Sequence, residues 1–253
     1  MSATAQVTAM RVLAALDLTS LGEDDTPAAI ARLCSDAAAG AHPAAVCVYP
    51  EHIVTARRTL DAAGAGDVAV ATVVNFPDGS GTLPQVLRET RRTLAAGADE
   101  IDLVFPWRAH LGGDREAGPL MLRECKAICG PRVLKAILET GELGDPLLIH
   151  ELADAALGAG ADFIKTSTGK TPTGATLPAA RVMLECIRER GGGPGFKAAG
   201  GIRTLAEANR YFSLADEMLG SAWATPARFR IGASALLAEI RAVAGTVSIA
   251  GEG

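Results

Sequence analysis

Short apolar segments rich in valine and isoleucine recur along the chain, and segments of helical length separate them. Alternating strands and helices are typical of a parallel sheet with crossover helices. Eight such segments can be counted: RVLAALDL (11–18), AAVCVYP (44–50), VAVATVVNFP (68–77), EIDLVFP (100–106), RVLKAILET (132–140), DFIKTST (162–168), GFKAAGG (195–201) and DEMLGS (216–221). Eight βα units in 253 residues are the size of a closed (β/α)8 TIM barrel, so we predict one α/β domain of that type over residues 1–253.

The segments that precede several expected strands end in a similar short sequence, namely AAGAGD, AAGADE and GAGADF. Glycine in this position is typical of a helix C-terminus, so the repeat supports alternating helices and strands. An open, doubly wound sheet is the alternative fold for the same pattern. No GxGxxG motif follows the first expected strand, which argues against the dinucleotide-binding form of that fold.

Lysine is scarce in this chain. Only five of the 24 basic residues are lysine, namely Lys126, Lys135, Lys165, Lys170 and Lys197. Arginine serves as well for surface charge, whereas only the lysine amine can lose its proton and attack a carbonyl group. A coding bias toward arginine would remove lysine mainly where the two are interchangeable. Three of the remaining lysines lie in the apolar runs RVLKAIL, DFIKTST and GFKAAGG, which indicates a functional amine.

Polar residues and glycines gather at the C-terminal ends of the expected strands. They are Asp17, Cys47, Asn75, Asp102, Lys135, Glu139, Lys165, Thr168, Lys197, Gly200 and Gly201. In a (β/α)8 barrel these strand ends meet at one face, where the chemistry of such enzymes takes place. Burying unpaired charges costs several kcal/mol, so the convergence of several lysines and aspartates indicates catalysis rather than stabilisation.

Charge and composition restrict the partners of the protein. The formal net charge of −5 and the lack of a basic cluster argue against nucleic acid or an anionic membrane surface. No stretch approaches the roughly 20 apolar residues of a membrane span, and the first residues lack the pattern of a secretory signal. The five cysteines have no paired CxxC spacing, which suits reduced thiols, and Cys125 and Cys129 have no companion metal ligand nearby. We therefore predict a cytoplasmic enzyme or small-molecule binder without a bound metal.

Eight motifs occur in order along nearly the whole chain: LDLTSL, CVYP, VVNFPDG, GADEIDLVFP, KAILETGEL, GADFIKTSTGK, KAAGGIRT and FRIGAS. In these motifs the chain resembles the deoxyribose-phosphate aldolases, which are class I aldolases of the (β/α)8 type. The resemblance implies reversible cleavage of 2-deoxy-D-ribose 5-phosphate to D-glyceraldehyde 3-phosphate and acetaldehyde, in deoxyribonucleotide catabolism. It also implies that Lys165 forms the Schiff base, that Lys197 and Asp102 handle protons, and that no cofactor is required.

Other strand-end residues are candidates for substrate binding. Asp17 and Thr168 would orient substrate hydroxyl groups, with loop capping as the alternative role. Cys47 would form a small apolar wall of the site. Lys135 would either enter the site or pair with Glu139 or Asp102 as a structural charge.

A phosphate site is expected near the end of the barrel sequence. Barrels commonly bind phosphate between the loops after the last two strands and the N-terminus of a helix. Gly200 and Gly201 would allow the backbone to approach an anion, and FRIGAS would place Gly232 and Ser234 at the start of the last helix. Lys170 would add positive charge there or lie at the solvated rim.

Two other functions fit the same residues: another lysine-dependent sugar-phosphate aldolase, including a transaldolase-like enzyme, and a non-catalytic sugar-phosphate binder. A homodimer is expected because such barrels commonly pair through their outer helices. Two features depart from the resemblance. Ala235 stands where relatives often have a second serine, and the end SIAGEG lacks the terminal tyrosine that reaches the site in some relatives.

Overall fold

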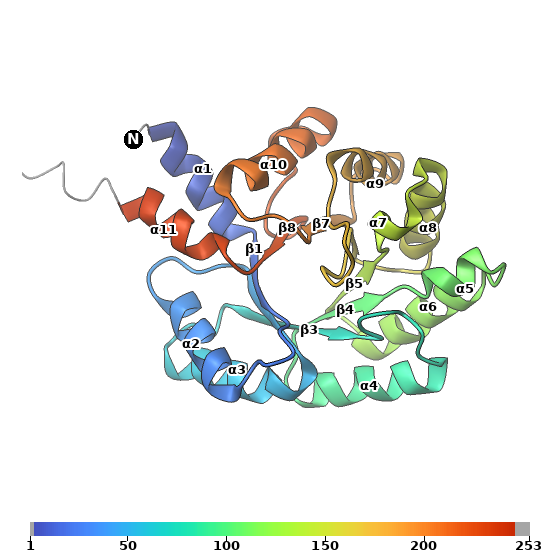
Figure 1. The fold of residues 1–253 in the computed structure, drawn as a ribbon, viewed down its shortest axis with the longest axis horizontal. Helices are drawn as coiled ribbons and strands as arrows, with labels where there is room; N and C mark the ends of the chain where they lie inside the picture. The colour runs from blue at the N-terminus through green and yellow to red at the C-terminus, as the bar shows by residue number, and fades with distance from the viewer. Residues whose placement is uncertain (1–2, 246–253) are drawn as a thin grey trace, which may run out of the picture.

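Eight parallel strands close into a barrel in the order in which they occur along the chain, and helices surround them (Figure 1). The computed structural model describes residues 3–245, so the chain end SIAGEG lies outside the described residues. The last strand pairs with the first, which closes the sheet and excludes the open doubly wound alternative. The predicted (β/α)8 barrel is therefore confirmed.

The strands are β1 (Leu16–Ser20), β2 (Ala45–Val48), β3 (Ala69–Val74), β4 (Glu100–Val104), β5 (Val133–Ile137), β6 (Phe163–Lys165), β7 (Gly195–Ala199) and β8 (Phe229–Ala233). The helices are α1 (Ala3–Ala14), α2 (Pro27–Ala38), η1 (Pro50–His52), α3 (Ile53–Ala62), α4 (Leu83–Ala95), α5 (Trp107–Leu111), α6 (Ala117–Cys129), α7 (Thr140–Leu143), α8 (Pro146–Gly158), α9 (Leu177–Glu189), α10 (Leu205–Leu219) and α11 (Leu236–Gly245).

Two expected strands were placed wrongly. The segment DEMLGS is not the eighth strand, because residues 216–219 complete helix α10 and the strand is formed by Phe229–Ala233 instead. Tyr211, Leu214 and Ala215 are buried at helical spacing, so the apolar face of α10 continues toward its last turn. The first strand also starts later than expected, at Leu16, because residues 11–14 belong to α1.

Side chains of the strands alternate between two environments. Those that point outward join the helices in one large apolar core, which includes Phe196, Phe212 and Phe229. Those that point into the barrel from β2 and β3 form a separate small cluster of Ala45, Cys47, Ala71 and Val73. Part of the barrel interior is therefore apolar and lined by small side chains, which leaves room for long side chains from the opposite strands.

Side chains at the helix N-termini fix where several helices begin. Thr26 caps α2 by accepting a hydrogen bond from the amide of Ala29, and Thr176 caps α9 in the same way. Thr204 and Glu207 form a capping box at the start of α10. These caps satisfy backbone donors that the helix itself leaves unpaired, and the last two fix the loops after β6 and β7.

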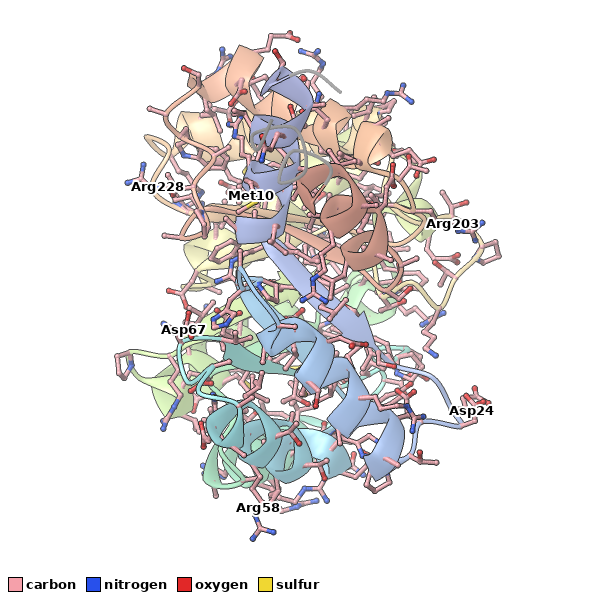
Figure 2. All side chains as sticks on the ribbon, turned by 90° about the vertical axis from the view of Figure 1, so that its left-hand side faces the viewer. Met10, Asp24, Arg58, Asp67, Arg203 and Arg228 are labelled. Carbon is pink, nitrogen blue, oxygen red and sulfur yellow. The ribbon has the colours of Figure 1, made fainter. Side chains whose placement is uncertain are left out.

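The two ends of the barrel can be told apart by the loops that project from them. In Figure 2, Asp24 and Arg203 project on one side of the molecule, from the loops that follow β1 and β7. Asp67 and Arg228 lie on the opposite side, in the segments that precede β3 and β8. The side with Asp24 and Arg203 is the C-terminal end of the strands, where the candidate site lies.

None of the described helices combines the length and the apolar character that a membrane span would need.

Candidate active site

Charged side chains from adjacent strands meet inside the barrel because the strand register aligns them. Lys165 of β6 is paired with Lys197 of β7, and Lys197 with Arg230 of β8. Asp102 of β4 is paired with Lys135 of β5. Register partners in a parallel sheet point to the same face, so these side chains share the interior of the barrel.

The amine of Lys165 belongs to a three-residue contact centred on the carboxylate of Asp102. Its Nζ is 2.8 Å from Oδ2 of Asp102, and the same carboxylate oxygen accepts a hydrogen bond from Nζ of Lys197 at 2.7 Å. Asp102 and Lys197 are fully buried, whereas Lys165 retains 2% of its accessible surface. Lys165 is therefore the amine of this group that solutes can reach.

The two amines differ in their electrostatic surroundings. Burial lowers the pKa of Lys165, and the nearby Lys197 cation acts in the same direction against the attraction of Asp102. Burial also disfavours the cation of Lys197, but the carboxylates of Asp102 and Asp17 outweigh it and hold its pKa above the ordinary value. For Asp102, the neighbouring lysines overcome the cost of burial and keep its pKa well below the usual range. The arrangement favours a neutral Lys165 between an ionised Asp102 and a protonated Lys197.

Asp17 lies below the cavity and does not reach it, although the sequence predicted that it contacts substrate. One of its oxygens accepts from Lys197 Nζ at 2.5 Å, and the other accepts from Arg230 Nη1 at 2.7 Å. The residue is fully buried, so both oxygens are occupied by cations and neither faces the cavity. Asp17 holds Lys197 in place, and the structure offers no free oxygen for a substrate hydroxyl group.

Lys135 pairs with carboxylates of β4 and not with Glu139. Its Nζ is 2.7 Å from Oδ1 of Asp102 and 2.5 Å from Oε2 of Glu100. It is fully buried and is not among the residues that line the cavity. Of the two roles left open for Lys135, the geometry favours that of a structural charge.

Glu100 and Arg230 belong to the same buried cluster and were missed by the sequence analysis. Arg230 donates to Oε1 of Glu100 at 2.8 Å. Glu100 precedes Asp102 by two residues on β4, which is the spacing that puts both side chains on one face of a strand. Arg230 was missed because the eighth strand was predicted at 216–221, and FRIGA was therefore not predicted to be a strand of the barrel.

A cavity of about 370 Å³ opens above Lys165 at the C-terminal end of the strands. Seven of the predicted site residues line it, namely Lys165, Thr168, Lys170, Gly200, Gly201, Gly232 and Ser234. The other walls come from the end of β1 and the start of the β1–α2 loop, and from Gly169, Ala199, Ile202, Arg203 and Ala233. The structure therefore brings the expected lysine and the expected phosphate-binding segment into one space.

Three residues that line this cavity have backbone amides without a protein acceptor. The N–H groups of Gly200, Gly201 and Ser234 donate no hydrogen bond to any group in the described part of the chain. Gly200 and Gly201 have φ angles of +90° and +82°, which side chains rarely adopt, so glycine is needed there. Unpaired amides at the mouth of a cavity can bind an anion.

The helix expected at this anion site begins later than predicted. Gly232 lies within β8 and Ser234 in the loop that follows, while α11 starts at Leu236. Gly232 has a separate role, because a Cβ atom at this position would lie 3.1 Å from Cε of Lys197 and 2.9 Å from Cβ of Ala199. The missing side chain therefore leaves the space through which Lys197 reaches its carboxylate partners.

The β6–α9 loop is held by Glu139. The hydroxyl of Thr168 donates to Oε2 of Glu139 at 2.5 Å, and it accepts a hydrogen bond from the amide of Lys170 at 3.0 Å. The amine of Lys170 donates to the backbone oxygen of Leu21 at 2.6 Å and so connects this loop to the β1–α2 loop. The hydroxyl of Thr168 is thus committed to the loop, although the residue lines the cavity.

Cys47 provides an apolar surface near the amines. It is fully buried in the interior cluster with Ala45, Ala71 and Val73. Burial raises the pKa of its thiol, so the side chain is a neutral thiol beside Lys165 and Lys197. Cys47 is not among the residues that line the cavity, so its role as a wall of the site remains a prediction.

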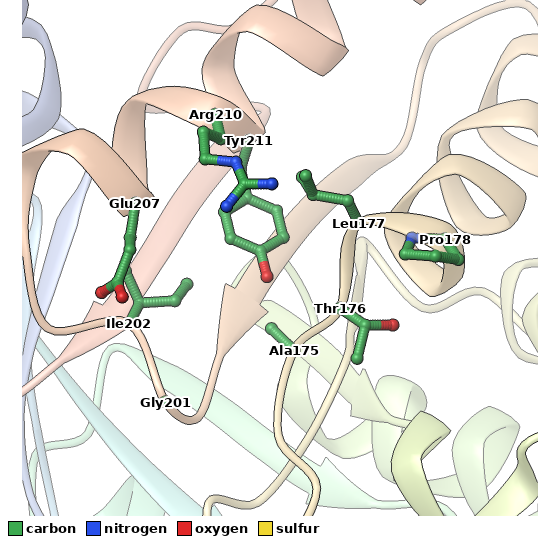
Figure 3. A pocket seen from close by; sticks show the side chains of 9 residues that line it. All are labelled: Ala175, Thr176, Leu177, Pro178, Gly201, Ile202, Glu207, Arg210 and Tyr211. Carbon is green, nitrogen blue, oxygen red and sulfur yellow. The ribbon is translucent and has the colours of Figure 1, made fainter.

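A second cavity of about 370 Å³ lies on the other side of the β7–α10 loop. Figure 3 shows Arg210 and Tyr211 of α10 on the side of the start of α9, and Glu207 beside Ile202 at the other edge. Gly201 and Ile202 border both cavities, so open space flanks the loop on two sides. The loop is tied instead to the β6–α9 loop, because Gly200 O accepts a hydrogen bond from Ala175 N at 3.0 Å.

Potential metal ligands lie away from the cavity. Among the described residues, one group of three has ligand atoms within 4.8 Å of one another, formed by His150, Cys186 and Glu189. These residues belong to α8 and α9, and none of them lines the cavity above Lys165. The expectation that the reaction needs no metal remains a prediction.

A closed barrel with a buried lysine amine at the floor of a cavity is typical of barrel enzymes that act through a lysine, as some aldolases do. Comparison with known families agrees. The chain belongs to the DeoC/LacD family of aldolases, which matches residues 11–239. The protein is therefore an aldolase of this family.

Solved structures similar to this chain include proteins of the same kind. A protein of Toxoplasma gondii ME49 with a provisional assignment as deoxyribose-phosphate aldolase is 29% identical over 97% of this chain and 98% of that one, with a TM-score of 0.91. The deoxyribose phosphate aldolase of Aeropyrum pernix, described as a tetramer, is 25% identical over 98% and 100% of the two chains, with a TM-score of 0.74. An aldolase called QR15 is 27% identical over 92% and 97%, with a TM-score of 0.76.

Proposed function

We propose that the protein is a class I aldolase that reversibly cleaves 2-deoxy-D-ribose 5-phosphate to D-glyceraldehyde 3-phosphate and acetaldehyde. The observation that carries this proposal is the amine of Lys165, which reaches the cavity, has a lowered pKa and lies beside an ionised carboxylate. A neutral amine is the nucleophile that forms a Schiff base with an aldehyde. The similar structures that are named deoxyribose phosphate aldolases support this substrate.

The first half of the proposed reaction forms the electrophile. Nζ of Lys165 attacks the C1 aldehyde of the open-chain sugar to give a carbinolamine, which loses water to give an iminium ion. Lys197 supplies the proton that the departing hydroxyl group needs and is held near by Asp102. The iminium ion then accepts the electron pair of the C2–C3 bond, which is the role a metal ion would play in a metal-dependent aldolase.

The second half breaks the carbon–carbon bond. Asp102, directly or through a water molecule, takes the proton of the C3 hydroxyl group as the C2–C3 bond breaks and D-glyceraldehyde 3-phosphate leaves. An enamine of acetaldehyde remains on Lys165, is protonated at C2 and is released by hydrolysis. The small apolar wall around Cys47 gives the two-carbon fragment a surface without competing polar groups.

The unpaired amides of Gly200, Gly201 and Ser234 would hold the phosphate of the substrate, with Lys170 and Arg203 at the rim adding positive charge. Because these groups lie in the same cavity as Lys165, a bound phosphate would place the other end of a five-carbon sugar toward the amine. This arrangement favours a phosphorylated substrate over a free sugar.

Ser234→Asp tests this phosphate site. Ser234 is exposed at the mouth of the cavity, so the substitution adds negative charge without disturbing the core. We expect the KM for deoxyribose 5-phosphate to rise by roughly tenfold or more, because like charges repel, with much less change for unphosphorylated deoxyribose. Ser221→Asp is the matched control, since Ser221 is exposed in the α10–β8 connection, on the other end of the barrel. Equal losses with both substrates would show that the phosphate binds elsewhere.

The proposed reaction implies a cellular setting. With this substrate the enzyme acts in the catabolism of deoxyribonucleosides, and a cytoplasmic location is expected. The homodimer stays a prediction. Product analysis with deoxyribose 5-phosphate distinguishes this function from the alternatives, because another sugar-phosphate aldolase would release a different pair of products and a binding protein would release none.

A further inference from the structure

Arg230 connects two carboxylates beneath the cavity and is remote from any substrate. Its guanidinium donates to Oδ1 of Asp17 at 2.7 Å and to Oε1 of Glu100 at 2.8 Å. Only 7% of its surface is accessible, and it is not among the residues that line the cavity above Lys165. Arg230 can therefore affect the reaction only through other residues.

The buried cluster is electrically balanced when Lys165 is left out. Its carboxylates are Asp17, Glu100 and Asp102, and its other cations are Lys135, Lys197 and Arg230. Each of these six side chains contacts at least two groups of opposite charge. A protonated Lys165 would add a positive charge that no carboxylate of this cluster balances, which costs several kcal/mol in a low-dielectric interior. The other buried carboxylate nearby, Glu139, is bound to Thr168 and Thr171 in the β6–α9 loop.

We propose that Arg230 and Glu100 are positioning residues that set the charge of this cluster, and that their balanced pair keeps Lys165 a neutral amine. Without Arg230, three carboxylates would face two cations, and a protonated Lys165 would restore the balance. Without the charge of Glu100, the cluster would have an excess of positive charge, and protonation of Lys165 would be disfavoured further. The inference rests on the proposed function, because it concerns the amine that forms the Schiff base.

Other strands leave few additional charges near Lys165. Within the described chain, β1, β4, β5, β7 and β8 contribute the six charged groups already named, and β2 contributes the neutral thiol of Cys47. Strand β3 has the sequence AVATVV and no titratable side chain. Asp102 and Lys197 act on the amine directly, whereas Arg230 and Glu100 can be changed without removing a contact of Lys165 or of Lys197.

The test measures how fast acetaldehyde and cyanoborohydride label Lys165 as a function of pH, by mass spectrometry of the intact protein and its peptides. For Arg230→Met we expect the midpoint of the pH profile to rise by roughly one pH unit, an approximately tenfold slower reaction at a fixed pH on the acidic side. For Glu100→Gln we expect a shift of similar size in the opposite direction. Comparing variants at the same pH cancels the pH dependence of the reductant.

Two further variants separate charge from structure. Arg230→Met with Glu100→Gln leaves two carboxylates and two cations, so its midpoint should return to that of the unmodified protein, and Arg230→Lys should shift it little. Shifts in one direction for both single variants, no shift, or no rescue in the double variant would overturn the proposal. If Arg230→Met does not fold, the proposal is tested by the other two variants. The pH midpoint must fall in Glu100→Gln and return to that of the unmodified protein in the double variant. Absence of any label on Lys165 in the unmodified protein would overturn the proposed function as well.

Discussion

Lys165→Arg is expected to abolish cleavage of deoxyribose 5-phosphate, with turnover reduced by more than about 10⁴-fold. Arginine keeps a cation at this position, but a guanidinium cannot lose its proton at neutral pH or form an imine. The measurement is the initial rate of D-glyceraldehyde 3-phosphate release at saturating substrate. A loss this large follows if every turnover passes through a covalent bond to this side chain.

The same substitution elsewhere serves as the control. Lys126 pairs with Asp162 on the outside of the barrel at 2.7 Å, so Lys126→Arg should retain the turnover of the unmodified protein. Thermal unfolding of both variants shows whether the barrel is intact. If Lys165→Arg folds and keeps even a tenth of the turnover, Lys165 is not the nucleophile.

Asp102→Asn should lower turnover by on the order of 10²-fold or more, which is typical for the loss of an acid–base group. The amide keeps the shape of the side chain but cannot take the proton of the C3 hydroxyl group. Because the substitution removes a negative charge, it does not favour protonation of Lys165, so labelling of Lys165 by acetaldehyde and borohydride should persist. We expect cleavage to fall far more than labelling.

A structural role for Asp102 would give a different result. Its carboxylate contacts three lysines and is fully buried, so the variant is also expected to unfold at a lower temperature. Asp24→Asn, at an exposed position of the β1–α2 loop, controls for the chemical change (Figure 2). If Asp102→Asn only melts earlier and retains its turnover, Asp102 is a structural partner of the lysines.

The sequence predicted the fold class because the barrel repeats one pattern, an apolar strand followed by a helix. With eight repeats, a few misplaced strand boundaries do not change the predicted fold. Its boundaries were less predictable. DEMLGS contains two apolar residues in a row and follows a helix, but Leu214, Ala215 and Met218 continue the apolar face of that helix. The eighth strand, FRIGA, contains an arginine and a glycine, which are unusual in a strand core and are explained only by the charged barrel interior.

The site was predictable where chemistry restricts the residue type. Three lysines stood out because each lies in an apolar run, and the family motifs then distinguished Lys165 and Lys197 from Lys135, which the structure shows paired with carboxylates. Arg230 and Glu100 were missed because a buried charge is recognised only when its partners are known, and those partners lie on other strands. Asp17 was expected to contact substrate, yet only the three-dimensional packing shows that two cations occupy its oxygens.

The buried histidines illustrate the same limit. His52 and His110 are buried although their sequence contexts do not indicate it, and each retains 5% of its surface. His110 is buried against Phe105, and its Nε2 lies 3.0 Å from Glu151 of α8. Neither residue lines the cavity above Lys165.

The measurement that tests this account most directly is the trapping of the acetaldehyde imine. The protein is incubated with acetaldehyde and borohydride, digested, and its peptides are analysed by mass spectrometry. The account predicts one irreversible two-carbon addition per chain, at Lys165, and its loss in Lys165→Arg. The other lysines differ in exposure, and Lys126 and Lys170 are more accessible than Lys165, so selective labelling of Lys165 would reflect its reactivity and not its exposure. No adduct, or an adduct at Lys135, Lys170 or Lys197 in place of Lys165, would contradict the account.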